Sequence, residues 1–227
     1  MRQWSYATAV VLAVASFGTI ARGELVDNFY YQSWAKFKPG ASVTLRDTLE
    51  IKIAEISQTN NMETTTTYTL AKVTPEQVEL HVTQMVTANN RTRPLPAQKM
   101  IIPAQTEKGQ EMGSMQVEGA RPVKQMITDV KQKEEHVEVS GVRVLATLRE
   151  YTIMGETASV SKVKTWYLPE VPGGVVKVES RTEGAVQSTT KMVLVEFQPQ
   201  KGVKGHLDEP VKPAAPATRP GAATRPR

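Results

Sequence analysis

The chain has 227 residues, no cysteine and a formal net charge of +5 at pH 7. Without cysteine it can form no disulfide bond and no thiolate metal site, and it has no cysteine nucleophile. The positive charge lies at the ends, because residues 1–23 carry +2, residues 201–227 carry +4 and residues 24–200 carry −1. A near-neutral central segment lacks the clustered basic charge of a nucleic-acid-binding surface, so we expect no nucleic-acid partner.

Residues 1–23 have the pattern of a secretory signal peptide. Arg2 precedes an apolar run over residues 6–20, and Ala21 and Gly23 then place small residues two positions apart before Glu24, as signal peptidase requires. The apolar run is shorter than the roughly 20 residues of a membrane-spanning helix, although an uncleaved anchor stays an alternative. Because secreted bacterial domains commonly lack cysteine, we expect export to the periplasm or outside of a bacterial cell envelope.

The next segment is rich in aromatic residues. Five of the thirteen aromatic residues of the chain lie within nine positions, namely Phe29, Tyr30, Tyr31, Trp34 and Phe37. The three-residue spacing of the last two favours a short helix or turn that presses on a sheet edge. We interpret this segment as an aromatic plug at one end of a core, with an exposed binding patch as the alternative.

Two-residue alternation then predicts long antiparallel strands. In the first strand Val43, Leu45, Leu49, Ile51 and Ile53 share one face, which is interrupted by Asp47. Such a period is typical of a strand with one buried face. A second strand over residues 64–73 is followed by the turn at residues 74–76 and by a third strand, and short turns between long strands indicate a meander. The third strand places its apolar residues on one face: Val78, Leu80, Val82 and Val86.

The second half repeats this pattern after a long loop. Residues 105–122 are interpreted as a loop or lid, since loops of this length are uncommon without a function. Further strands are expected over residues 123–139, 142–149, 160–168, 176–181 and 188–197. We therefore predict an all-β domain over residues 24–200, with eight to ten strands in a strongly curved antiparallel meander that forms a half-barrel or open barrel. The Pro- and Ala-rich residues 201–227 are predicted to be a disordered basic tail.

The sequence shows no motif for metal binding, cofactor binding or nucleophilic catalysis. His81, His136 and His206 are far apart, and no HExxH or GxSxG pattern is present. We therefore predict no enzymatic activity, no metal and no cofactor. Trp166, next to a Pro- and Gly-rich loop, is either a core residue or an aromatic lining for an apolar ligand.

Several motifs resemble a family of uncharacterised exported β proteins of planctomycete-like bacteria. These are VEVSGVRVLATLREYT at residues 137–152, TWYLPEVPGGVVKVE at residues 165–179, the pair Glu196 and Phe197, and the opening WAKFKPGASV at residues 34–43. The strand pattern is similar to the half-barrels of lipoprotein-localisation chaperones and of mycobacterial lipid-binding lipoproteins. The resemblance implies a curved sheet with an apolar cavity.

These observations lead to a ranked set of functional hypotheses. The first is a non-enzymatic envelope protein that binds a lipid or another apolar ligand on the concave face of the sheet. The second is a structural or interaction protein with a packed sheet, whose basic tail contacts anionic envelope polymers. A hydrolase comes third, and the ligand's identity and the oligomeric state stay open. The residues predicted to line the ligand site are Val43, Leu45, Leu49, Ile51, Val78, Leu80, Val82 and Trp166.

Overall fold

The computed structural model describes most of the predicted domain. The described residues are 24–53, 58–88, 91–108, 116–117, 126–154, 160–183 and 186–207. The expected signal peptide with Ala21 and Gly23 lies outside them, and Glu24 is the first described residue. Within these ranges no helix is long and apolar enough to cross a membrane.

The described chain consists almost entirely of antiparallel strands. It contains β1 (Leu25–Asp27), α1 (Phe29–Ala35), β2 (Ser42–Ile53), β3 (Gln58–Val73), β4 (Gln77–Ala88), β5 (Arg91–Pro94), β6 (Gln98–Pro103), β7 (Gln105–Glu107), β8 (Gln116–Val117), β9 (Met126–Val139), β10 (Val142–Met154), β11 (Val160–Tyr167), β12 (Val175–Glu183) and β13 (Val186–Gln198).

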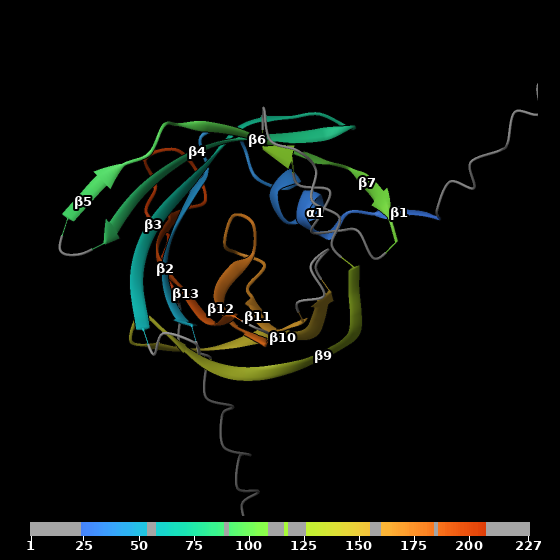
Figure 1. The fold of residues 1–227 in the computed structure, drawn as a ribbon. Helices are drawn as coiled ribbons and strands as arrows, with labels where there is room; N and C mark the ends of the chain where they lie inside the picture. The colour runs from blue at the N-terminus through green and yellow to red at the C-terminus, as the bar shows by residue number, and fades with distance from the viewer. Residues whose placement is uncertain are drawn as a thin grey trace, which may run out of the picture.

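Eleven strands form one sheet in the order β8-β6-β4-β3-β2-β13-β12-β11-β10-β9, and β5 also pairs with β4. Strands β1 and β7 form a separate two-stranded sheet. No pairing joins the edge strands β8 and β9 within the described ranges, so the sheet is open and curved, as predicted (Figure 1). The sheet has more than the expected eight to ten strands, since the short strands β5 and β8 carry no strong alternation of their own.

The two halves of the chain meet in the middle of the sheet. Strand β2, the first of the sheet, pairs with β13, the last, from Ser42 opposite Gln198 to Ile53 opposite Val186. The first half then extends from β2 toward β8, and the second half extends from β13 toward β9. The chain is thus two meanders joined at β2 and β13.

Helix α1 confirms the predicted short helix in the aromatic segment. It begins at the N-cap Asn28, whose buried side chain accepts a hydrogen bond from the Tyr30 N–H at 3.0 Å and donates to the Pro103 carbonyl at 2.9 Å. The Tyr31 hydroxyl donates to the Thr74 carbonyl at 2.8 Å. These bonds fix α1 against the β3–β4 turn and the end of β6, within the open side of the curved sheet (Figure 1).

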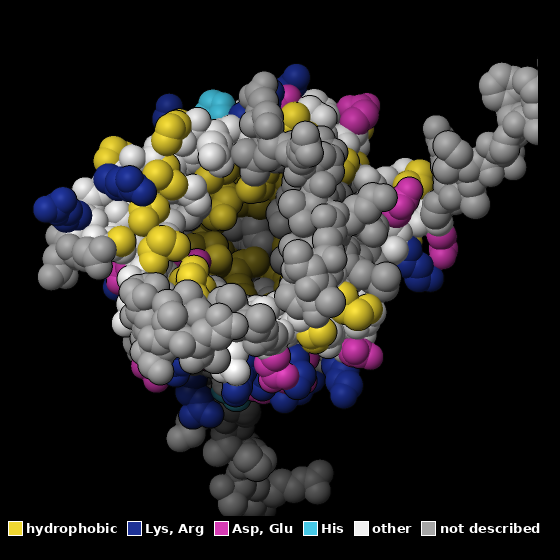
Figure 2. Space-filling view, in the orientation of Figure 1, with side chains coloured by type: hydrophobic (Ala, Val, Ile, Leu, Met, Phe, Trp, Pro, Cys, Tyr) yellow, Lys and Arg dark blue, Asp and Glu magenta, His cyan; other side chains and the backbone are white. Residues whose placement is uncertain are grey.

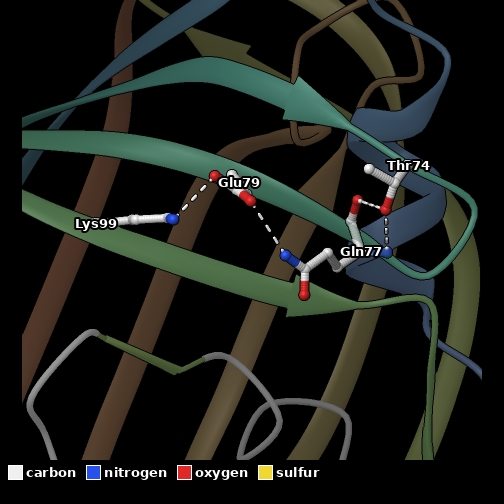
Figure 3. A network of polar contacts seen from close by, with 4 residues as sticks. All are labelled: Thr74, Gln77, Glu79 and Lys99. Carbon is white, nitrogen blue, oxygen red and sulfur yellow. Dashed lines mark hydrogen bonds and ion pairs between the residues drawn. The ribbon is translucent and has the colours of Figure 1, made fainter.

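The hydrophobic core draws on both halves of the chain and on α1. Its most deeply buried side chains are Leu70, Leu80, Ile102, Leu148, Val78, Val139, Val171 and Val176. On β4 and β6 polar residues occupy the other face, as a network there shows (Figure 3), whereas on β10 and β11 the face opposite the cavity also buries Leu148 and Trp166. In the network on β4 and β6, Lys99 pairs with Glu79 at 2.9 Å, and Gln77 donates to the same carboxylate at 3.1 Å.

The chain remains packed on the sheet beyond the predicted start of the disordered tail. Residues 201–207 are described, and the Gly205 N–H donates to the Phe197 carbonyl at 2.8 Å. Leu207 packs against the core. The prediction of a tail from residue 201 is therefore corrected for these seven residues. Because Gly205 has no side chain, the segment can pass directly over the Phe197 ring. The remainder of the predicted tail lies outside the described residues.

Candidate functional site: an apolar cavity inside the curved sheet

A cavity of about 290 Å³ lies on the concave face of the sheet. The space-filling view shows a hollow lined by hydrophobic side chains (Figure 2). Its size is near the lower end of the roughly 300–1,000 Å³ that ligand pockets occupy. Its walls come from α1, both halves of the sheet and the β11–β12 loop: Tyr30, Trp34, Val43, Leu45, Tyr68, Leu80, Met100, Ile102, Tyr151, Ile153, Val163, Thr165, Tyr167, Pro172, Gly173, Val175, Val178, Ser180, Thr190 and Met192.

Trp34 and the β11–β12 loop close one side of this cavity. Gly173 has a φ of +76°, and a Cβ atom added there would lie 2.8 Å from the Trp34 indole. Its N–H donates to the Ser33 carbonyl at 3.3 Å. A residue with a side chain would push the indole away, so the glycine lets the loop and the helix touch over the cavity.

Three of the predicted ligand-lining residues line the cavity, namely Val43, Leu45 and Leu80. Val78 and Val82 are fully buried in the core and do not line it. Leu49 and Ile51 are only half-buried and also lie outside the lining. The prediction named the correct face of β2 and β4, but alternation along a strand does not show where along the strand a cavity begins and ends.

Trp166 does not line the cavity, so this part of the prediction is wrong. Its strand neighbours Thr165 and Tyr167 line the cavity, and Trp166 points to the opposite face because side chains alternate along a strand. There the indole donates to the Glu135 carboxylate at 3.4 Å, and the Lys177 ammonium lies 4.9 Å from the ring centroid. Trp166 is a buried packing residue of the outer face.

Four hydroxyl groups gather at one wall of the cavity. The Tyr30 and Tyr167 hydroxyls are 3.4 Å apart, and the Tyr151 and Thr165 hydroxyls are 3.2 Å apart. Burial, with smaller contributions from Tyr167 and Tyr151, raises the pKa of Tyr30 well above its ordinary value. Burial and the nearby Tyr151 raise the pKa of Tyr167 to about 12. The Tyr30 and Tyr167 hydroxyls are therefore neutral at physiological pH and can donate hydrogen bonds.

Arg149 lies behind this wall. It pairs with Thr165 in the β10–β11 register, which places both side chains on the same face. Its guanidinium carbon lies 4.9 Å from the Phe29 ring centroid, and that ring makes an edge contact with Tyr167 at 4.9 Å. Burial raises the pKa of Tyr30 and of Tyr167, and the positive charge of Arg149 partly offsets this by lowering both pKa values. Its Nε atom is buried and has no hydrogen-bond partner among the described residues.

Asp47, which interrupts the apolar face of β2, is half-buried. It lies opposite Met192 in the β13 register. Its Oδ1 atom is buried without a hydrogen-bond partner in the described part of the chain, and burial raises the pKa of the carboxyl. The aspartate is therefore a polar defect in an otherwise apolar face.

No cluster of three or more His, Asp or Glu side chains that could hold a metal ion occurs among the described residues. His81, His136 and His206 are all exposed.

Sequence reasoning missed most of the aromatic and hydroxyl-bearing wall. Tyr30 and Trp34 were interpreted as a plug without a link to the ligand site, although they line the cavity. The density of aromatic residues before the first long strand was the available signal. Tyr151 and Thr165 gave no signal, because neither stands out from the alternating pattern around it.

Comparison with known proteins adds little to this description. No protein-family model matches the chain, and no curated protein matches it. Among solved structures the chain is similar to a Bacteroides fragilis protein described as exported and as having a YmcC-like fold. The TM-score is 0.39 and the sequence identity is 11%, over 73% of this chain and 98% of the other.

Proposed function

We propose that this protein is an exported, non-enzymatic protein of the bacterial cell envelope that holds an apolar ligand, such as a lipid chain, inside its curved sheet. The observation that carries the proposal is the cavity of about 290 Å³, whose walls are mostly apolar and come from both halves of the chain. Proteins usually fill their cores to high packing density, so a hollow of this size and lining is typical of a binding site. Export is supported by the signal-like residues 1–23.

The size of the cavity favours a ligand with one chain. A diacyl lipid would need a pocket well above the lower end of the usual range, whereas a single acyl chain is narrow and apolar along its length. Each buried methylene contributes about 0.8 kcal/mol. A single chain can therefore bind firmly through its length alone.

The test is native mass spectrometry of the purified protein, followed by solvent extraction and lipid analysis, with a blocked variant beside it. Thr190 lines the cavity, and the next residue, Lys191, points to the opposite face. We expect Thr190→Trp to fill the cavity and abolish ligand capture, while the matched Lys191→Trp control retains it. Melting curves of both variants show that each is folded.

An absence of any co-purifying or added single-chain ligand in the wild-type protein would overturn the proposal. Equal binding by Thr190→Trp and wild type would also overturn it, because the ligand would then lie elsewhere. Either result would favour a packed sheet with a structural or interaction role.

A further inference from the structure

The hydroxyl groups at the cavity wall carry more hydrogens than the hydrogen bonds between them use. Each hydroxyl carries one hydrogen, so the Tyr30–Tyr167 pair and the Tyr151–Thr165 pair each use one hydrogen and leave one over. Thr165 also lowers the pKa of Tyr167 through a side-chain hydrogen bond, so the two pairs can be connected. Even if a third bond joins the two pairs into a chain of four, one hydrogen stays free. The wall therefore presents one or two unused donors to an apolar cavity.

Donors without an acceptor are unfavourable in a buried site, so the wall has room for an acceptor group from a ligand. The sign of the local charge decides which acceptor fits. The guanidinium of Arg149 is permanently positive, and it lies on the same face, close enough to lower the pKa of Tyr30 and Tyr167. No acidic side chain forms a salt bridge with Arg149 among the described residues. A negatively charged acceptor would accept hydrogen bonds from the unused hydroxyl donors and would compensate the positive charge of Arg149.

We propose that the ligand is an amphiphile with a single apolar chain whose carboxylate binds the hydroxyl group cluster of Tyr30, Tyr151, Thr165 and Tyr167, next to Arg149. This inference rests on the proposed function, because it concerns the polar end of a ligand in the same cavity. A carboxylate has two acceptor oxygens, which matches one or two free hydroxyl hydrogens. A phosphate has three oxygens and would leave more of them without a donor in a buried site.

The experiment compares ligands that share one twelve-carbon chain and differ only in the polar end: dodecanoate, dodecanol, dodecylammonium and dodecyl phosphate. Isothermal titration calorimetry with the delipidated protein at neutral pH gives the four dissociation constants. Charge-assisted hydrogen bonds contribute about 1.5–3 kcal/mol, so dodecanoate should bind roughly tenfold to a hundredfold more tightly than dodecanol. Dodecylammonium should bind most weakly.

Variants assign the preference to the wall. Tyr30→Phe, Tyr151→Phe and Arg149→Gln should each lower the ratio of dodecanoate affinity to dodecanol affinity, and Arg149→Lys should retain most of it because the charge stays. Two matched controls should leave the ratio unchanged. Tyr31→Phe removes the hydroxyl of the neighbouring helix residue, which bonds to Thr74 instead, and Arg143→Gln removes an exposed arginine of the same strand.

The outcomes separate this inference from the proposed function. If dodecanoate and dodecanol bind equally well, the cavity holds apolar chains but the carboxylate inference is overturned. Tighter binding of dodecyl phosphate or dodecylammonium than of dodecanoate overturns it as well. If none of the four ligands binds, the proposed function itself fails. If Tyr30→Phe and Tyr31→Phe change the ratio of dodecanoate to dodecanol affinity equally, the carboxylate does not bind at this wall.

Discussion

Three glycines with positive φ form a graded series that tests how closely the β11–β12 loop packs on helix α1. A Cβ atom at Gly141 would meet nothing within 4 Å, one at Gly174 would lie 3.4 Å from the Tyr167 ring, and one at Gly173 would lie 2.8 Å from the Trp34 indole. All three have φ values between +75° and +84°. Substitution by alanine therefore imposes a similar backbone strain at each site and a different steric contact.

The expected costs follow from these contacts. An L-residue in the left-handed region costs roughly 1–2 kcal/mol, partly offset by about 0.4–1 kcal/mol from the stiffer unfolded chain. Gly141→Ala should thus lower the free energy of unfolding by about 1 kcal/mol, and Gly174→Ala by a similar amount. Gly173→Ala must also displace the indole, and overpacking typically adds about 1–3 kcal/mol. Its total cost should reach about 2–4 kcal/mol.

Urea unfolding gives these free energies, and a melting curve gives a second measure at about 2–4 °C per kcal/mol for a chain of this size. A double-mutant cycle with Trp34→Phe assigns the extra cost, because the smaller ring leaves space for the new methyl group. In that background Gly173→Ala should cost no more than Gly141→Ala. If the three single variants are equally stable, the loop does not pack on Trp34 as described. The same follows if Trp34→Phe leaves the extra cost unchanged.

Two further predictions concern other parts of the sheet. Burial raises the pKa of the Asp47 carboxyl. The folded protein therefore loses stability as the pH rises from below the ordinary pKa of about 3.9 through the raised value, because the buried group must then become charged. At neutral pH, Asp47→Asn should stabilise the protein by about 1 kcal/mol. This gain should vanish near pH 3, and urea unfolding that shows the same gain at both pH values would contradict the assignment. A Cβ atom at Gly205 would clash with the Phe197 ring, so Gly205→Val should release residues 201–207 from the sheet and speed their proteolysis. Lys204→Val, at an exposed position of the same segment, is the control and should change the proteolysis rate much less.

The alternation of apolar residues was sufficient to predict the strands and, within one strand, the buried face. Val43 and Leu45 on β2 and Leu80 on β4 were correctly assigned to the concave side because side chains of a strand alternate without exception where no residue is inserted. The open, curved antiparallel sheet followed from the length of these strands and the short turns between them. The sequence is also the sole basis for the expected export signal.

The same rule fails where a β-bulge adds a residue to one strand. Register shifts occur between Glu150 and Thr152, between Trp166 and Tyr167, and between Leu194 and Glu196. A bulge puts the alternation before and after it out of phase, so a pattern that extends across it assigns residues to the wrong face. Trp166 lies next to such a shift, but the inserted residue is Val176 on β12, and β11 alternates without a break, so the wrong face of an intact strand was assigned to the cavity.

The sequence by itself thus determined the local structure: which segments are strands and which of their faces is apolar. It also excluded disulfide and thiolate-metal chemistry, because the chain has no cysteine. Only the tertiary structure decided that β2 pairs with β13 and that α1 closes over the concave face. It alone brought Tyr30 to Tyr167 and placed Arg149 behind them. The physical reason is range, because alternation acts between residues two positions apart, whereas the β2–β13 pairing and the Tyr30–Tyr167 contact join residues more than a hundred positions apart and depend on how the whole sheet curves.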